Sequence, residues 1–126
     1  MKIRSSEDIV LVRQWVRKAA VSIGFGIVDQ TKVVTASSEL ARNTLDYGGG
    51  GLVEGAIVEN DRRSGIKLTF TDEGPGIPDI NLALTDGYTS GSGMGLGLSG
   101  AKRLSHEFEI SSKVGEGTSV TILRWK

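Results

Sequence analysis

The chain has 126 residues, of which 38% are hydrophobic and 24% charged, and its formal net charge is zero. This length supports one hydrophobic core, so we expect a single domain over residues 1–126. The absence of cysteine excludes disulfides and thiolate metal sites, and a lone histidine, His106, excludes a multi-histidine metal site. The balanced charge argues against nucleic acid or an anionic membrane as a partner, because both attract clustered Lys and Arg.

No apolar run approaches the roughly 20 residues that span a bilayer, and the first residues lack a signal-peptide pattern. We therefore expect a cytoplasmic protein. The 18 glycines are unusual, and many of them fall within residues 48–51 and 87–100. Since glycine costs chain entropy on folding, such clusters indicate either flexible segments or a backbone that approaches another group closely.

The first half of the chain predicts two helices and a hairpin. Apolar residues recur at helical spacing over Ile9–Ile23 and again over Asp29–Leu45, where Asp29 suits the N-cap. Two strands follow, Leu52–Glu59 and Ile66–Thr71, around a polar turn at residues 60–65. A short strand at the very start, Lys2–Arg4, is also expected.

The second half begins with an irregular region over residues 73–93 that contains a short helix near Asp79–Leu84. A long helix is predicted over Gly95–His106, and a hairpin of Phe108–Ser112 and Thr118–Trp125 closes the chain. Two hairpins predict a mixed, mainly antiparallel sheet. The three amphipathic helices must bury their apolar faces, and one face of this sheet can cover them. We expect an α/β (α+β) two-layer sandwich with three helices on one face of the sheet.

Glu39 and Asn43 lie four residues apart on the second predicted helix, so they project from one face a turn apart. A carboxylate can take a proton from an attacking hydroxyl, and an amide oxygen suits Mg²⁺. Taken alone, a pair of this kind far more often belongs to an ordinary exposed helix face.

Asp72 follows the alternating strand and opens the sequence Asp-Glu-Gly-Pro-Gly-Ile-Pro. Its carboxylate can accept from an exocyclic amine such as adenine N6. Gly74 and Gly76 allow a tight turn and leave room for a flat ring. The same residues also suit a simple turn at the end of a strand.

A glycine-rich run, residues 91–97, enters the third long helix. Free N–H groups at a helix N-terminus bind phosphate, although a flexible loop is an equal alternative. The spacing fits neither a Walker A loop nor a dinucleotide-binding fingerprint. In the last hairpin turn, Thr118 of Gly-Glu-Gly-Thr could share a hydrogen-bond network with Asp72, or simply follow a common turn.

Together, and in this order, these motifs resemble the N, G1 and G2 boxes of the GHKL superfamily, which includes gyrase, Hsp90, histidine kinases and MutL. Within it, the segments at residues 25–30, 38–43, 72–80 and 115–118 resemble the stand-alone anti-sigma-factor serine kinases of bacteria. The resemblance implies the Bergerat ATP-binding fold and transfer of the ATP γ-phosphate to a serine or threonine of a STAS-domain partner. It also implies a second role, binding a PP2C-type phosphatase and activating it.

The resemblance further assigns roles to the residues. Glu39 is expected as general base, Asn43 as a ligand of Mg²⁺, and Asp72 with Thr118 as the reader of adenine. The expected ATP-binding set is Asn43, Asp72, Gly74, Gly76, Ile77, Gly91, Gly93, Met94, Gly95, Leu96, Gly97 and Thr118.

Three alternatives stay open from the sequence. An ATP-hydrolysing machine like Hsp90 or gyrase would place the same motifs in a longer multidomain chain. A histidine-kinase catalytic fragment would follow a phosphoacceptor helix pair. A non-enzymatic, nucleotide-gated switch that binds an anti-sigma partner or a phosphatase would not need Glu39.

Overall fold

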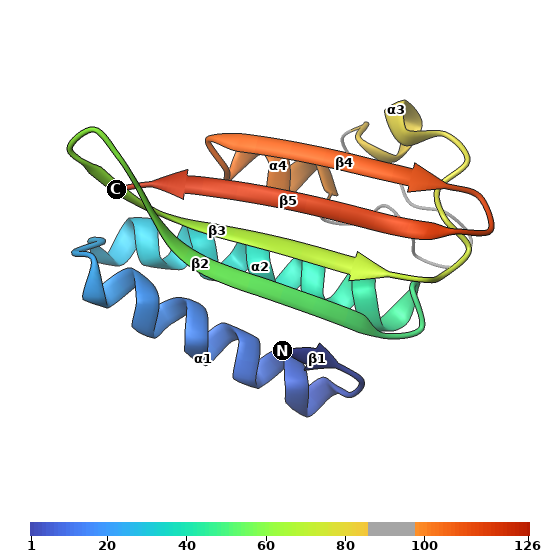
Figure 1. The fold of residues 1–126 in the computed structure, drawn as a ribbon, viewed down its shortest axis with the longest axis horizontal. Helices are drawn as coiled ribbons and strands as arrows, with labels where there is room; N and C mark the ends of the chain where they lie inside the picture. Colours follow the sequence, from blue (N-terminus) through green and yellow to red (C-terminus); the bar gives the residue numbers. More distant parts are fainter. Residues whose placement is uncertain (86–97) are drawn as a thin grey trace.

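The computed structural model describes residues 1–85 and 98–126 (Figure 1). This part of the chain forms two layers, a five-stranded sheet in the order β1-β2-β3-β5-β4 and helices that cover one of its faces. Every strand pair in these ranges is antiparallel. The predicted two-layer, mainly antiparallel sandwich is therefore confirmed.

Helices α1 (Ser6–Ser22) and α2 (Ile27–Asp46) pack beside each other on the sheet. The prediction that Asp29 caps the second helix is wrong, because α2 begins two residues earlier with Gly26 at the N-cap. Asp29 instead lies in the first turn, where its Oδ1 accepts a hydrogen bond of 2.7 Å from Nη2 of Arg124.

The first hairpin is longer than its sequence pattern predicts. Strands β2 (Gly51–Asn60) and β3 (Arg63–Asp72) pair along their whole length, which leaves a turn of only Asp61 and Arg62. The predicted turn over residues 60–65 is therefore wrong, because both strands extend into this segment. β5 pairs with Gly65, and the N–H of Lys126 bonds to the carbonyl of Ser64 at 2.8 Å. Strand β1 (Lys2–Ile3) is as short as expected.

After β3 come α3 (Ile80–Ala83), α4 (Leu98–Arg103), β4 (Glu107–Lys113) and β5 (Gly117–Trp125). The first three residues of the predicted helix over residues 95–106 lie outside the described residues. Its predicted end is wrong, because α4 stops at Arg103. His106 lies just before β4 and bonds to β5: its N–H donates to the Leu123 carbonyl and its Nδ1 accepts from the Trp125 N–H at 2.8 Å.

The core lies between the helices and the inward-facing residues of the central strands. Alternate residues of β2, β3 and β5 point toward the helices, as the period of a strand requires. The fully buried side chains from these strands are Val53, Ile66, Leu68 and Ile122. The opposite sheet face is more polar, with Thr69 and Thr121 joined through their hydroxyls at 3.0 Å. In the described ranges no helix has the length and apolar character needed to cross a membrane.

Candidate functional site

Asp72 is the last residue of β3, where it lies between Gly51 of β2 and Thr118 of β5. One carboxylate oxygen, Oδ1, accepts from the N–H of Gly74 at 2.9 Å. Partial burial raises the pKa of the Asp72 carboxyl, and hydrogen bonds from the backbone of Gly74 and Thr118 oppose that rise. The side chain is therefore half removed from water and still has acceptor capacity for a ligand donor.

Glycines surround Asp72 because nothing larger fits. A Cβ on Gly48 would meet the side chain of Asp72, and a Cβ on Gly117 would meet its backbone carbonyl. Gly117 and Gly76 also have φ of +104° and +78°, a region that other L-residues rarely adopt. Within the run at residues 48–51, Gly48 and Gly51 are therefore glycines because neighbouring atoms leave no room for a Cβ.

The hydroxyl of Ser112 ties the loop after β3 to the last hairpin. Its oxygen accepts from the N–H of Ile77 at 2.7 Å, donates to the carbonyl of Gly117 at 3.1 Å and lies 2.8 Å from the hydroxyl of Thr118. Thr118 is buried, with 7% of its surface exposed. The Thr118 hydroxyl thus contacts Ser112, a partner that was not anticipated, and the sequence-based link between this hydroxyl and Asp72 stays a prediction.

Tyr47 is a second residue that sequence reasoning missed. It follows α2, and its phenol donates a hydrogen bond of 2.6 Å to the carbonyl of Gly76. A signal was present, since Tyr47 lies four residues after Asn43 and therefore on the same side of the helix.

A cavity of about 20 Å³ lies between these elements. Its described lining residues are Leu40, Asn43, Thr44, Tyr47, Phe70, Asp72, Ile77, Leu98, Thr118 and Val120. Four of the predicted site residues, Asn43, Asp72, Ile77 and Thr118, therefore meet at one place although 75 positions separate the first from the last. The enclosed volume holds about one water molecule, so it is the floor of a site and not the whole of one.

Glu39 does not line this cavity. It lies on the exposed surface of α2, one helical turn before Asn43. The predicted phosphate-binding residues Gly91, Gly93, Met94, Gly95, Leu96 and Gly97 lie outside the described residues.

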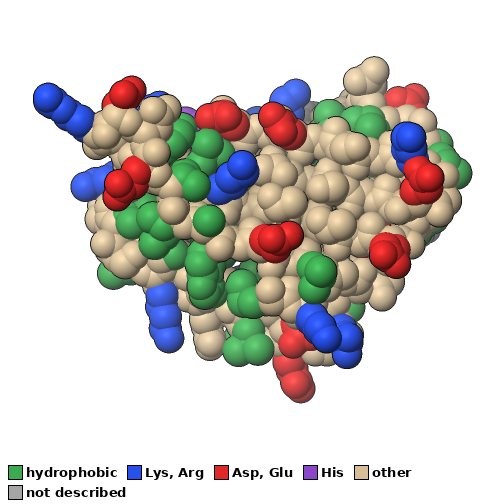
Figure 2. Space-filling view, viewed as in Figure 1, with side chains coloured by type: hydrophobic (Ala, Val, Ile, Leu, Met, Phe, Trp, Pro, Cys, Tyr) green, Lys and Arg blue, Asp and Glu red, His purple; other side chains and the backbone are tan. Residues whose placement is uncertain are grey.

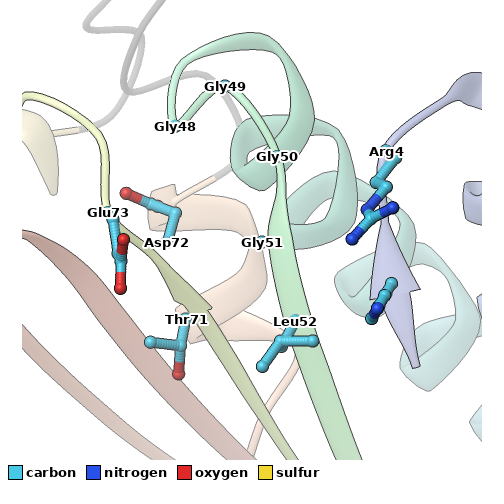
Figure 3. Close-up of a pocket in the computed structure, with 10 residues that line it drawn as sticks. Arg4, Gly48, Gly49, Gly50, Gly51, Leu52, Thr71, Asp72 and Glu73 are labelled. Atoms are coloured by element: carbon cyan, nitrogen blue, oxygen red, sulfur yellow. The ribbon is translucent and has the colours of Figure 1, made fainter.

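A larger hollow of about 480 Å³ lies on the other side of Asp72 (Figure 3). The glycine turn of residues 48–51 borders it, with Glu73 just after β3 on one side and Arg4 after β1 on the other. Of the predicted site residues in the described ranges, it contains Asp72 alone. We place the candidate site at the smaller cavity, because there the carboxylate, the amide and the buried hydroxyl converge.

This arrangement suits a flat, amine-bearing ring at Asp72. The carboxylate can accept from the amine, and the buried Thr118 hydroxyl can donate or accept beside it. The amide of Asn43, at the same cavity, is a hard oxygen ligand of the kind that Mg²⁺ takes together with phosphate oxygens. Within residues 1–85 and 98–126, no cluster of three His, Cys, Asp or Glu side chains could hold a metal ion.

The chain is similar to known ATPases and kinases. Residues 28–126 match the family described as histidine kinase-, DNA gyrase B-, and HSP90-like ATPase. Over 125 residues the chain is 43% identical to the serine/threonine-protein kinase RsbT of Bacillus subtilis (strain 168), covering 99% of this chain and 94% of that protein.

Solved structures share the fold at low sequence identity. The RsbU and RsbW domains of Rv1364c from Mycobacterium tuberculosis give a TM-score of 0.67 at 20% identity, with 100% of this chain and 32% of that one covered. The chain thus spans about a third of that protein's structure. The mycobacterial sensor histidine kinase MprB gives a TM-score of 0.61 at 22% identity, with 99% and 96% covered.

Proposed function

This chain belongs to the histidine kinase-, DNA gyrase B- and HSP90-like ATPase family and is a serine/threonine protein kinase of a partner-switching system, and we propose that its substrate is a STAS-domain protein. The observation that carries this proposal is the 43% identity to a serine/threonine kinase over nearly the whole chain. The convergence of Asn43, Asp72 and Thr118 supports it, because the proposed ATP chemistry needs these residues together.

We propose that Asp72 and Thr118 read the adenine of ATP and that Gly74, Gly76 and Ile77 shape the pocket. Gly91, Gly93, Met94, Gly95, Leu96 and Gly97 are proposed to cradle the phosphates. Mg²⁺, held by Asn43 and phosphate oxygens, would neutralise part of the phosphate charge when bound.

Glu39 is proposed as the general base. It takes the proton of the acceptor hydroxyl while the hydroxyl oxygen bonds to the γ-phosphorus and the β–γ bridging oxygen leaves with ADP. Its exposed position on α2, a turn from Asn43, suits an acceptor that arrives on a separate protein. A base that activated water for simple ATP hydrolysis would need no such access.

The test is transfer of labelled γ-phosphate from Mg-ATP to STAS-domain proteins of the same genome. We expect label on one of them, loss of transfer with Glu39→Ala, and retained transfer with Glu109→Ala, an exposed glutamate of β4. Calorimetry should show that Glu39→Ala still binds ATP. Full transfer by Glu39→Ala would remove this residue from the mechanism, and tight ATP binding without transfer to any STAS protein would contradict the proposed substrate.

We also propose the second role that the family resemblance implies, which is to bind and activate a PP2C-type phosphatase. Activation by binding does not consume ATP, so Glu39→Ala should still raise phosphatase activity toward a phosphorylated STAS protein. A phosphatase rate unaffected by the wild-type chain would argue against this role.

A further inference from the structure

Arg124 is a buried charged side chain that the proposed mechanism does not use. It is 8% exposed and lies on the inward face of β5, in the alternation that also buries Val120 and Ile122. The open face of the sheet carries its charged side chains scattered over the surface (Figure 2). Arg124 instead points into the layer of helices, where both of its bonding partners lie.

The guanidinium of Arg124 joins two helices to the sheet. Its Nη1 donates a hydrogen bond of 2.7 Å to the carbonyl oxygen of Leu104, and its Nη2 donates one of 2.7 Å to Oδ1 of Asp29. The N–H of Leu104 bonds to the carbonyl of Gly100 at 3.0 Å, so Leu104 continues the last turn of α4. Asp29 lies in the first turn of α2. We call Arg124, Asp29 and the Leu104 carbonyl the arginine clamp.

The arginine clamp fixes geometry more than it adds stability. Removing a guanidinium from water is costly, and Nε of Arg124 has no hydrogen-bond partner among the described residues. This cost offsets much of the gain from the two charge-assisted bonds. The N–H groups of a guanidinium form a planar, rigid fork, so two bonds from it fix the positions of both acceptors.

Both helices of the arginine clamp also reach the candidate site. Asn43 lies about 21 Å along α2 from Asp29, at about 1.5 Å per residue. Figure 1 shows α2 running from the end of the molecule that holds the C-terminus to the end where β3 stops. Leu98, the first residue of α4, lines the same small cavity as Asn43, and α2 and α4 pack against each other. The separation of Asn43 and Leu98 therefore depends on how the clamp holds the far ends of their helices.

The predicted adenine end of the site does not depend on the arginine clamp. Asp72 is held within the sheet, where it pairs with Gly51 and Thr118. Along β5, Arg124 lies roughly 20 Å from Thr118 at about 3.4 Å per residue. A change at the clamp should therefore shift the helices without moving Asp72 or Thr118.

We propose that Arg124 is a positioning residue for phosphoryl transfer, and that it acts by holding α4 and α2 at the separation that the reaction needs at Asn43. The inference rests on the proposed function, in which Asn43 lies beside the phosphates of ATP. With the clamp broken, nucleotide still binds at Asp72, but its phosphates are out of line for transfer.

Asp29→Ala tests the arginine clamp from its more exposed side. The Asp29 side chain is 42% exposed, so its removal should leave the protein folded, which circular dichroism checks. Asp29→Asn is the conservative variant, because its amide oxygen can still accept from Arg124. Asp46→Ala is the matched control, since it removes the exposed ion pair with Arg42 on the same helix.

Transfer to the STAS-domain acceptor gives the first readout, with kcat calculated per nucleotide-binding site counted by calorimetry. We expect kcat to fall about tenfold in Asp29→Ala, because misplaced phosphates slow the chemical step. Asp29→Asn and Asp46→Ala should stay within about twofold of the wild type. A kcat of Asp29→Ala equal to that of Asp46→Ala would overturn the proposal, as would an Asp29→Asn as slow as Asp29→Ala.

The ratio of Mg-ATP to Mg-ADP affinity gives a second readout that needs no acceptor. We expect this ratio to fall about threefold in Asp29→Ala, because contacts to the γ-phosphate are lost while adenine stays bound. A merely structural role would weaken both nucleotides alike and leave the ratio unchanged, which would also overturn the proposal. If the wild-type chain transfers to no STAS-domain protein, the proposed substrate fails, and this ratio alone decides for or against the arginine clamp.

Discussion

The phenol of Tyr47 donates a hydrogen bond of 2.6 Å to the carbonyl oxygen of Gly76, and so joins the end of α2 to the loop that follows β3. Both segments border the small cavity at Asp72. The helix that carries Asn43 and the loop that carries Ile77 are therefore held at a fixed separation by one side chain.

Tyr47→Phe should weaken ATP binding about fivefold, because a hydrogen bond of this kind contributes about 1 kcal/mol. Calorimetric titration with Mg-ATP measures the change. The matched control is Thr69→Val, which removes a half-buried hydroxyl contact on the other face of the sheet. That control should leave ATP affinity unchanged. Equal affinities for Tyr47→Phe and wild type would show that the bond does not support the site.

Asp72→Asn should abolish most ATP binding without unfolding the protein. The amide oxygen can keep the bond to Gly74, but an NH₂ group then faces the adenine amine, and two donors cannot pair. Burial raises the pKa of Asp72, so at neutral pH the charged carboxylate destabilises the folded state relative to the unfolded chain. The neutral amide of asparagine does not have this unfavourable effect. We expect ATP affinity to fall about tenfold or more and the melting temperature of the free protein to be equal or higher.

Thermal unfolding and calorimetry on the same Asp72→Asn preparation separate the two effects. A large drop in melting temperature would mean that the carboxylate supports the fold itself. Unchanged ATP affinity would remove Asp72 from adenine recognition.

Gly48→Ala should also weaken ATP binding, although Gly48 lies outside the motifs that predicted the ATP-binding residues. The added Cβ meets the side chain of Asp72, so the carboxylate or the glycine turn must shift. Gly26→Ala is the control, because a Cβ there meets nothing within 4 Å and the backbone has φ of −69°. Titration with Mg-ATP should show a clear loss of affinity for Gly48→Ala alone. The same affinity in both variants would mean that the turn is not packed against Asp72.

Stability should fall as the pH drops below about 6.5, the ordinary pKa of histidine. Burial lowers the pKa of His106, and the charges of Arg124 and Arg63 lower it further. The unfolded chain therefore takes up the proton first, and the free energy of unfolding decreases from about pH 6.5 down to the lower pKa of the folded state. Nδ1 must also stay unprotonated to accept from Trp125.

Urea titrations between pH 8 and 5 measure this His106 effect. His106→Asn keeps an acceptor for the Trp125 N–H and does not titrate, so its unfolding free energy should vary less over the same interval. The Arg124 hydrogen bond lowers the pKa of Asp29, so that group responds only below about pH 4. Identical pH profiles for the variant and the wild type would contradict the assignment to His106.

Local patterns in the sequence predicted the existence of the elements better than their ends. The alternation of Ile66, Leu68 and Phe70 identified β3, because those residues face the helices. The extension of β3 to Arg63 could not be predicted, since it depends on pairing with the distant residues of β5 and Lys126. The N-terminus of α2 was misjudged for a similar reason. Asp29 is a good N-cap by residue type, but its carboxylate accepts a hydrogen bond from Arg124, near the far end of the chain.

The residues of the candidate site also fall into those that the sequence could predict and those that it could not. Motif order alone associated Asp72 with Thr118, and the structure places them opposite each other on β3 and β5. Ser112 could not be predicted, because a serine in a strand is an ordinary residue until the fold brings Ile77 to it. The spacing from Asn43 could have placed Tyr47 on the same side of the helix, but its bond to Gly76 depends on the fold.

Because the cavity takes Asn43 from a helix and Thr118 from the last strand, it exists only after β5 has joined the sheet. Strand β5 lies between β3 and β4, so the chain must close a long loop before Thr118 reaches Asp72. A folding intermediate that contains only α1, α2 and the first hairpin would have no adenine pocket. ATP should then slow unfolding without speeding the early steps of refolding, and stopped-flow traces with and without nucleotide would reveal that asymmetry.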